Sequence, residues 1–484
     1  MRFIGRKQEL RKLQDLSRLP RPILAVIMGR RRIGKSRLAE EFSKGKIFLP
    51  FSGLAPTPPM SAQDQRDAFA RKFCEHFKLP PLTFLDWSDA FAHLSEHLTD
   101  KPTVILFDEM SWMGAKDHTF IPKLKVWWDL TLQRYPNVFL IFCGSVSTWI
   151  EKNILNSTAF FGRVSLQIDL EDLSLPECYE FLKQIGFKGS TYDIVKILSV
   201  TGGIPWYLEQ IEPNKTADEN LKDLCFKKNG LLVNEVDKVF NDLFSDRGTV
   251  YKEIVHILSM GMRSREEIRT ELDYAKSGSL SDHLKALITS GFVSQHYEWS
   301  LKTGKMGKKS LYRLSDNYLR FFIKYIEPNL SKINTNSYRD LSLSQLSGWE
   351  SMMGFQVENL LLKNRHLILK ALDIPSSEVV ADNPYIQRPL ARQRGCQIDY
   401  LIQTHMNNLF VCEFKFKRSE IGLEIIDEVK EKVRRFVKPR GYGIAPVLIH
   451  IGGVTESVYD KHYFYRILDI ADFLEGNVQP GVNG

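Results

Sequence analysis

The chain has 484 residues, of which 43% are hydrophobic and 26% charged, so it is long enough for about three domains with cores of their own. No apolar run approaches the roughly 18 residues that a membrane span needs, which excludes a membrane protein and predicts a cytoplasmic location. The six cysteines form no CxxC pair and no metal-ligand spacing, which excludes a disulfide framework and a zinc site. The net charge of +8 is mild support for an acidic partner such as nucleic acid.

Residues 29–36 read Gly-Arg-Arg-Arg-Ile-Gly-Lys-Ser and match the GxxxxGK[ST] pattern of a phosphate-binding loop. They follow the apolar run 22–28 and precede the helix-forming segment 37–42, which is the order of strand, loop and helix that the motif requires. Lys35 is expected to reach the β- and γ-phosphates of ATP, and Ser36 to bind a magnesium ion. The residues predicted to bind ATP here are Gly29, Arg30, Arg31, Arg32, Ile33, Gly34, Lys35, Ser36 and Arg37.

A second apolar run, residues 103–107, ends in Asp108 and Glu109. Because open α/β sheets bind ligands at the carboxyl ends of their strands, Asp108 is expected to hold the magnesium ion. Glu109 is then expected to polarise the water that attacks the γ-phosphate. An Asp-Glu pair after a strand is also typical of a solvated strand end, but its pairing with the loop favours the catalytic interpretation.

A third apolar strand is expected at residues 138–144 and ends in Ser145, which is a candidate for sensing the γ-phosphate or orienting the attacking water. Downstream, Arg163 precedes another expected strand at 164–168. Arg163 is a candidate for completing the transition-state charge, in its own subunit or in a neighbouring one. The alternative is a surface arginine after a turn.

These segments, in this order, resemble an archaeal-type ATPase of the AAA+/STAND P-loop lineage over roughly the first half of the chain. The resemblance also rests on residues 3–10 and on the Gly-Gly-Ile-Pro segment at 202–205. It implies that Gly5 and Arg6 border the adenine pocket and that 202–205 belong to a helical lid. This segment continues with Trp206 and Tyr207 and contains no arginine, which departs from the usual AAA+ lid. A plain helix stop is the alternative for the glycines and proline.

Residues 250–313 are expected to form three short amphipathic helices and then a hairpin, which is the order of a winged helix-turn-helix. Ser264 and Glu267 have the spacing of a capping box at the start of the second helix. The basic segment 302–309 at the hairpin tip is suited to phosphate contacts. The third helix offers few groups for reading bases, so a structural hinge or a protein-contact unit is the alternative.

The last third of the chain contains a second candidate site. Asp399 lies in an expected strand at 397–402, and alternation puts Glu413 and Lys415 on one face of the next strand. Two carboxylates and a lysine on adjacent strands are the set that phosphodiester cleavage with one or two magnesium ions needs. Glu358, on an expected earlier helix, is a further candidate metal ligand.

The succession of helix, hairpin, charged helix and strand in this region resembles the PD-(D/E)xK nuclease superfamily, which also has degenerate members. The resemblance implies that Asp399 and Glu413 hold the metal and that Lys415 assists the attacking water or steadies the phosphate. Lys430, Lys432, Arg434 and Arg435 of the charged helix are candidates for lining a nucleic-acid groove, although such charges usually mark a solvated face. A cross-face ion pair between Glu413 and Lys415 is the alternative for the strand.

The sequence therefore predicts a multidomain α/β protein. Its expected parts are a P-loop ATPase core with a parallel sheet (1–170), a helical lid (171–245), a winged helix-turn-helix (246–335) and a PD-(D/E)xK nuclease-like domain (345–475). ATP hydrolysis with magnesium is expected to control nucleic-acid binding, with DNA favoured over RNA, and a metal-dependent endonuclease site. The alternative is an ATP-dependent switch that binds DNA or protein through an inactive nuclease fold. A homo-oligomer or a protein partner is compatible with either.

Overall fold

The computed structural model describes residues 3–55, 60–114, 116–145, 148–244, 248–274, 279–338, 341–389, 391 and 393–477. The chain divides into two compact units, Met1–Asp172 and Leu173–Gly484. The first boundary lies close to the predicted end of the ATPase core at residue 170, and the later predicted boundaries fall inside the second unit and stay predictions. All six cysteines are buried free thiols. Within the described ranges, no helix combines the length and the apolar character of a membrane span.

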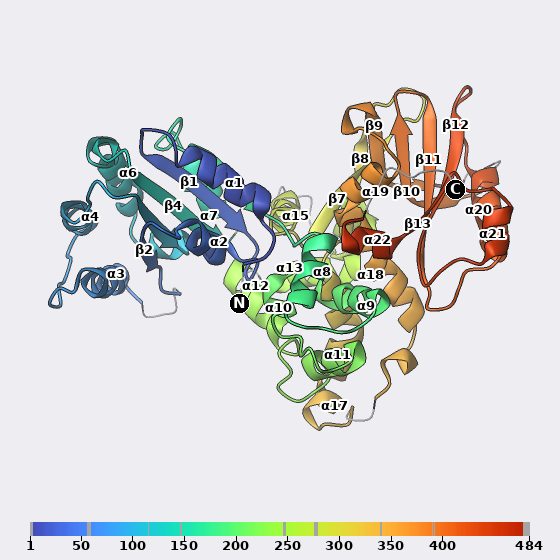
Figure 1. The fold of residues 1–484 in the computed structure, drawn as a ribbon, viewed down its shortest axis with the longest axis horizontal. Coiled ribbons are helices and arrows are strands. Elements are labelled where there is room, and N and C mark those ends of the chain that lie inside the picture. Colours follow the sequence, from blue (N-terminus) through green and yellow to red (C-terminus); the bar gives the residue numbers. More distant parts are fainter. Residues whose placement is uncertain are drawn as a thin grey trace. The chain divides into compact units, whose positions relative to one another are not determined.

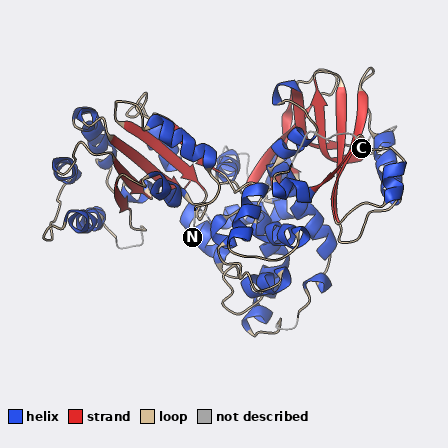
Figure 2. Cartoon of the chain, viewed as in Figure 1, coloured by secondary structure: helices blue, strands red, loops and turns tan. Residues whose placement is uncertain are grey.

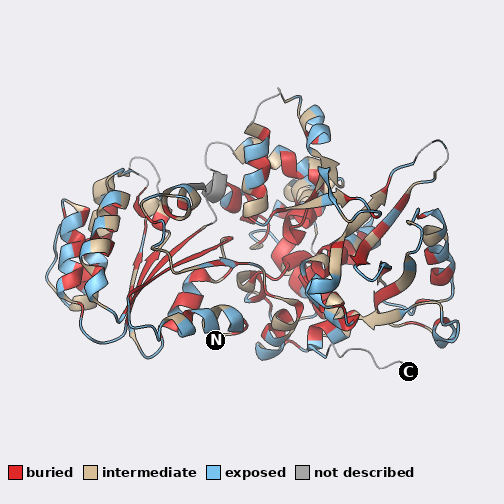
Figure 3. Cartoon of the chain, turned by 90° about the horizontal axis from the view of Figure 1, so that it is seen from above, coloured by how far each residue is buried: buried red, intermediate tan, exposed pale blue. Residues whose placement is uncertain are grey.

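The first unit is built on a five-stranded parallel sheet with the strand order β2-β3-β4-β1-β5 (Figure 1). The three inner strands β1, β3 and β4 are almost wholly buried, as the red strands of Figure 3 show, whereas the edge strands β2 and β5 are only partly buried. Parallel strands covered on both faces need continuous apolar runs, which is why they are visible in the sequence. The strands are β1 (Ile23–Gly29), β2 (Ile47–Ser52), β3 (Thr103–Asp108), β4 (Val138–Ser145) and β5 (Leu166–Leu170).

Helices connect the strands of this sheet, as parallel pairing requires. An aromatic core packs on one sheet face, where Phe51 stacks on Phe69 with ring centroids 4.3 Å apart and Phe91 stacks on Trp127 at 4.8 Å. The helices are α1 (Lys7–Leu16), α2 (Lys35–Phe42), α3 (Ala62–Phe77), α4 (Trp87–Glu96), α5 (Met110–Met113), α6 (Phe120–Leu130) and α7 (Thr148–Ile150).

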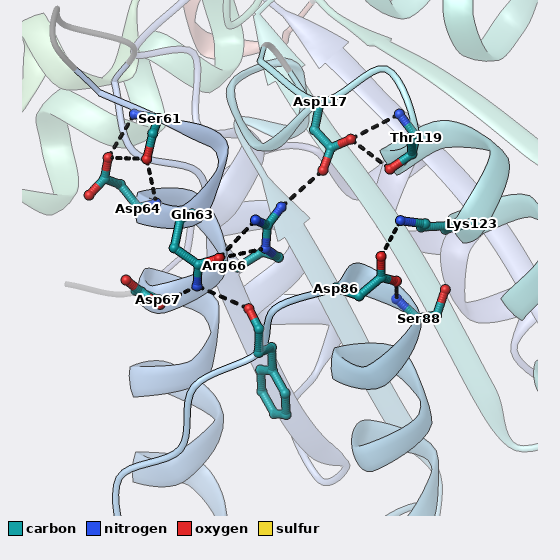
Figure 4. Close-up of polar contacts among 11 residues, drawn as sticks. Ser61, Gln63, Asp64, Arg66, Asp67, Asp86, Ser88, Asp117, Thr119 and Lys123 are labelled. Carbon is teal, nitrogen blue, oxygen red and sulfur yellow. Dashed lines mark hydrogen bonds and ion pairs between the residues drawn. The ribbon is translucent and has the colours of Figure 1, made fainter.

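Polar contacts fix α3 and α4 to the segment around the start of α6 (Figure 4). Arg66 of α3 forms an ion pair of 3.0 Å with Asp117, which also accepts hydrogen bonds from the backbone and hydroxyl of Thr119. Asp86, the N-cap of α4, forms an ion pair with Lys123 of α6. The connection between β2 and β3 is thereby tied to the chain that follows β3.

The second unit begins with five helices. Capping boxes start α8, α9 and α11, and Gly202 ends α9 with a φ of +61° before Pro205 starts α10. The Gly-Gly-Ile-Pro segment is thus a turn between two helices, and its assignment to a lid stays a prediction. The helices are α8 (Leu175–Gln184), α9 (Thr191–Thr201), α10 (Pro205–Leu208), α11 (Ala217–Cys225) and α12 (Glu235–Phe244).

Three helices and a small antiparallel sheet of order β6-β8-β7 follow, and the winged helix-turn-helix assignment for them stays a prediction. The capping box of Ser264 and Glu267 is present at the start of α14, as predicted. Strand β8 begins at Met306, so the loop at the hairpin tip is shorter than the basic segment 302–309. The elements are α13 (Gly248–Ser259), β6 (Arg263–Ser264), α14 (Arg265–Glu271), α15 (Ser279–Thr289), β7 (Val293–Trp299) and β8 (Met306–Leu314).

A second five-stranded sheet, of order β13-β12-β11-β10-β9, follows the helices α16 (Asn317–Phe321), α17 (Leu330–Asn334), α18 (Trp349–Lys363) and α19 (Arg365–Ala371) (Figure 2). The strands β9, β10 and β11 pair antiparallel, whereas β11, β12 and β13 pair parallel. The remaining elements are β9 (Val379–Gln387), β10 (Cys396–Thr404), β11 (Asn408–Phe416), α20 (Glu424–Arg435), β12 (Gly443–Ile451), α21 (Glu456–Asp460), β13 (Arg466–Asp469) and α22 (Ile470–Glu475).

The hairpin of β7 and β8 packs against this second sheet. Trp299 donates through Nε1 to Oε1 of Gln403 at 2.7 Å, and Nε2 of Gln403 donates to the carbonyl oxygen of Leu301 at 2.8 Å. The hairpin is therefore joined to the sheet through its apolar side, while the lysines of its loop and of the start of β8 are exposed: Lys302, Lys305, Lys308 and Lys309. Trp299 and Leu301 share a buried cluster with Ala381, Cys396, Ile398, Leu401, Leu409, Val411 and Phe436.

Candidate functional site

The predicted phosphate loop joins the end of β1 to the start of α2, and two glycines shape it. A Cβ at Gly29 would lie 2.7 Å from the carbonyl oxygen of Leu170, so no larger residue fits there. Gly34, the N-cap of α2, has a φ of +93°, which side-chain-bearing residues rarely adopt, and no atom lies within 4 Å of its would-be Cβ. The loop therefore curls in front of a helix N-terminus and leaves room there, as an anion site requires.

Lys35 is the first residue of α2, and its side chain turns back onto the loop. Its side chain is buried, and Nζ donates to the carbonyl oxygens of Gly29 and Arg30 at 3.1 Å each. An ammonium group held by loop carbonyls next to a helix N-terminus is in position to exchange those contacts for phosphate oxygens. That Lys35 holds the β- and γ-phosphates stays a prediction.

Ser36 and Asp108, the two residues predicted to hold magnesium, are in direct contact. The Ser36 hydroxyl donates to Oδ2 of Asp108 at 2.6 Å, although 72 positions separate them in the chain. A hydroxyl and a carboxylate provide the hard oxygen ligands that Mg²⁺ prefers, so the donor set fits this ion together with nucleotide phosphates. A cavity of about 510 Å³ adjoins the pair and is lined by residues of α2, β2, β3 and α3.

Glu109 follows Asp108 in a backbone conformation with a φ of +47°, which is uncommon for a residue other than glycine. Its Oε2 is buried and has no hydrogen-bond partner among the described residues. Burial raises the pKa of the Glu109 carboxyl, and the positive charge of Lys35 opposes this rise. A strained, partly desolvated carboxylate beside the loop is suited to accept a proton from an attacking water.

Ser145, the third predicted catalytic residue, ends the strand between β1 and β3. It lies opposite Gly29 in the β1–β4 register, and its backbone N–H contributes a hydrogen bond to Glu109. The end of β4 is therefore part of the same cluster as the loop and the carboxylates.

Arg163 is not brought to this cluster. The backbone N–H of Ser165 donates to the carbonyl oxygen of Leu24, so Arg163 lies near the amino edge of the sheet. Five residues of strand, about 16 Å, separate that edge from the phosphate loop. There Arg163 forms a two-pronged ion pair with Asp129, at 2.6 and 2.9 Å. A role of Arg163 toward a neighbouring subunit stays a prediction.

Gly5 and Arg6, the residues expected beside the adenine, connect to the loop. Both have positive φ, +70° for Gly5 and +55° for Arg6. The Arg6 side chain is buried, and Nη2 donates to the carbonyl oxygens of Ile33 and of Glu171, which follows β5. Arg6 thus fastens the segment before α1 to the phosphate loop.

The four other arginines of the predicted ATP site differ in their surroundings. Arg30 is buried, and Arg31 and Arg32 are half-buried. The charge of Arg31 lowers the pKa of Glu109, which places it near the catalytic cluster. Arg37 is exposed and forms an ion pair of 2.6 Å with Glu40 on the same helix.

The second candidate site lies on β10 and β11 of the other unit. Asp399 and Glu413 flank the paired residues Tyr400 and Cys412 on these antiparallel strands. The backbone N–H of Phe414 donates to Oδ2 of Asp399 at 2.9 Å. Burial, together with the charge of Glu413, raises the pKa of Asp399 to about 7. The two carboxylates predicted from the sequence therefore lie together in a buried place.

Two lysines contact these carboxylates. Nζ of Lys415 lies 3.2 Å from Oε1 of Glu413 and 2.6 Å from Oε2 of Glu428. Lys432 of α20 donates to Oε2 of Glu413, and its Nζ lies 3.9 Å from Oδ1 of Asp399. From the sequence, Lys432 is predicted only to lie on a charged helix. Its contact with Glu413 could not be predicted, because no residue pattern tells which strand that helix covers.

Glu358 of α18 is engaged elsewhere. It contributes to the raised pKa of Asp399, yet it forms a buried ion pair with Arg313 of β8. Over the described part of the chain, no three His, Cys, Asp or Glu side chains are grouped as metal ligands. Carboxylates suit magnesium, but the ammonium of Lys432 lies against both of them, so the arrangement as folded does not fit a bound metal ion.

Residues 3–211, which include the loop and the candidate residues Asp108, Glu109 and Ser145, match the family described as "ATPase domain predominantly from Archaea". This match supports ATP binding and hydrolysis. An uncharacterized protein of Methanocaldococcus jannaschii is 24% identical over 335 residues, 68% of this chain and 70% of that protein.

Solved structures that are similar to this chain include an ATPase and an ORC2 protein. The Walker-type ATPase of Pyrococcus abyssi is 18% identical, with a TM-score of 0.49 over 66% of this chain and 96% of that one. The ORC2 protein of Aeropyrum pernix is 13% identical, with a TM-score of 0.40 over 68% of this chain and 93% of that one.

Replacing Lys35 by alanine removes the cation at the centre of the loop. We expect ATP hydrolysis at saturating magnesium and ATP, measured as phosphate release, to fall by about 10²- to 10³-fold, because transition-state charge loses a fixed partner. Lys44→Ala, which removes an exposed lysine just after the same helix, should leave the rate unchanged. A folded Lys35→Ala chain that hydrolyses ATP at the parent rate would contradict the site.

Proposed function

We propose that this protein is a magnesium-dependent ATPase whose nucleotide state controls a nucleic-acid-binding winged region and a metal-dependent nuclease-like region. The hydrogen bond between Ser36 and Asp108, beside the buried Lys35, is the observation that carries the ATPase part. Ser36 and Asp108 would hold the magnesium ion, which neutralises phosphate charge when bound. Lys35 binds the phosphate oxygens, and Glu109 orients the attacking water and accepts its proton.

Nucleic acid is the partner that the exposed charges of the second unit favour. Four exposed lysines lie in the β7–β8 loop and at the adjoining start of β8, and lysines bind phosphates without reading sequence. Because the apolar side of the hairpin packs on the C-terminal sheet, a phosphate backbone at the tip would lie beside both regions. A helix-turn-helix with a basic hairpin is typical of proteins that bind duplex DNA, which favours DNA over RNA.

The second activity that we propose is phosphodiester cleavage. The adjacent Asp399, Glu413 and Lys415 favour it, because the two carboxylates would hold a water-activating metal once the ammonium group of Lys432 had left them, and Lys415 would stabilise phosphate charge. The ion pairs that Glu413 and Glu358 already make favour the alternative, which is a switch that binds nucleic acid without cutting it.

Control by the nucleotide requires that DNA affinity depend on the nucleotide bound. We expect the dissociation constant of a labelled DNA duplex, measured by fluorescence anisotropy on the full chain, to differ about fivefold or more between ADP and a slowly hydrolysed ATP analogue. Lys308→Glu/Lys309→Glu should weaken binding in both states and reduce its salt dependence. Lys12→Glu/Lys101→Glu, with exposed lysines of the first unit, is the matched control. Equal affinities in both nucleotide states would argue against control.

Cleavage is tested by incubating the full chain with single- and double-stranded DNA and RNA, at millimolar magnesium or manganese, with and without ATP. We expect Glu413→Ala/Lys415→Ala to cut at least about 10²-fold more slowly, because it lacks one metal ligand and the phosphate-stabilising cation. Equal cutting by this variant would identify a contaminating nuclease. Intact binding without any cutting would instead support the switch.

A further inference from the structure

We propose that the ammonium group of Lys432 stands where a divalent cation would sit between Asp399 and Glu413, and that it keeps the C-terminal site closed to metal until it is withdrawn. The proposal rests on the proposed nuclease function in one respect, which is that Asp399 and Glu413 are taken as the metal ligands. It adds a regulatory element, an intramolecular cation that competes with the metal.

The contacts of Lys432 carry this inference. It reaches the site from α20, bonds Oε2 of Glu413 and lies 3.9 Å from Oδ1 of Asp399. A group that contacts one oxygen of each carboxylate occupies the space that a shared metal ion needs, since metal–oxygen distances are about 2 to 2.5 Å. Lys415 takes the opposite oxygen of Glu413, at 3.2 Å, so both oxygens of that carboxylate are engaged.

Charge balance points the same way. Three carboxylates, Asp399, Glu413 and the more exposed Glu428, face the two ammonium groups of Lys415 and Lys432, and Glu413 is only 4% exposed. A divalent cation added to this set would leave an excess of positive charge in a largely buried place, which is costly. Removal of one ammonium group makes the set more negative, so that it attracts the metal.

The same lysine is able to leave. Its side chain is 30% exposed, against 5% for its partner Glu413, and it lies in the last turn of α20, next to the exposed Arg434 and Arg435. A lysine stem carries an ammonium group over several ångströms by rotamer changes alone. A nucleic-acid phosphate near this helix end would offer Lys432 a new partner, so substrate binding and metal binding would support each other.

Manganese binding to the nucleotide-free full chain, followed by electron paramagnetic resonance of free Mn²⁺, tests the proposal. We expect Lys432→Met to bind Mn²⁺ at least about tenfold more tightly than the parent chain, because a positive charge within about 4 Å of the metal position is gone. Lys432→Met/Glu413→Gln should lose this binding. Lys432→Arg keeps the charge, and Lys430→Met changes a lysine of the same helix that lies over the Tyr463 ring. Both should bind like the parent.

Lys432→Met leaves Glu413 less well paired and can therefore lower the stability of the chain. For this reason the melting temperature is measured as a second readout. Mn²⁺ should raise the melting temperature of Lys432→Met, and also of Lys432→Gln, but not that of the parent or of Lys430→Met. Equal Mn²⁺ affinity in the parent and Lys432→Met, whether tight or absent, would overturn the proposal. A Lys432→Met chain that binds Mn²⁺ through Glu413 and cuts no nucleic acid would support the proposal that Lys432 excludes the metal, and it would refute the nuclease function. A parent chain that cuts nucleic acid and binds Mn²⁺ as tightly as Lys432→Met would refute metal exclusion by Lys432 and leave the nuclease function standing.

Discussion

The contact between Ser36 and Asp108 is the one on which the chemistry of the first unit depends. Ser36 lies in the helix that follows β1, and Asp108 ends β3. These two strands are not neighbours, because β4 lies between them and sets their ends about 10 Å apart. The first turn of α2 closes this gap, and it is able to do so only because Gly29 and Gly34 let the chain turn sharply out of β1. Lys35 and Glu109 are the chain neighbours of the two contacting residues, and Ser145 ends β4, the strand between β1 and β3.

The second unit depends on a different constraint, the joint between a hairpin and a sheet. Trp299 is anchored through Gln403, which lies on the same strand as Asp399. Arg313, on the other strand of the hairpin, neutralises Glu358, whose charge acts on Asp399. The hairpin is therefore connected to the carboxylate site both through strand β10 and through a buried ion pair.

The parts that the sequence predicts well are those whose signal is local. The inner parallel strands β1, β3 and β4 are continuous apolar runs, the phosphate loop is eight consecutive residues, and the capping box of Ser264 and Glu267 spans one helical turn. The parts that it misses depend on distant contacts or interrupted patterns. Strand β9 contains Asp382, Asn383 and Pro384, which hide its strand character. The position of Arg163 follows from the register of β5 against β1. The position of Lys432 follows from the way in which α20 packs. Neither the register nor the packing can be read from the residues that adjoin Arg163 or Lys432 in the sequence.

The central claim is that the loop after β1 binds ATP together with a magnesium ion held by Ser36 and Asp108. Calorimetric titration of the full chain with ATP, in magnesium and in EDTA, tests it most directly when the Ser36→Ala variant is titrated beside the parent. The account predicts one ATP per chain and an affinity at least about tenfold higher with magnesium, a gain that Ser36→Ala loses. A parent chain that binds no ATP, or a Ser36→Ala chain that keeps the full magnesium-dependent gain, would contradict it.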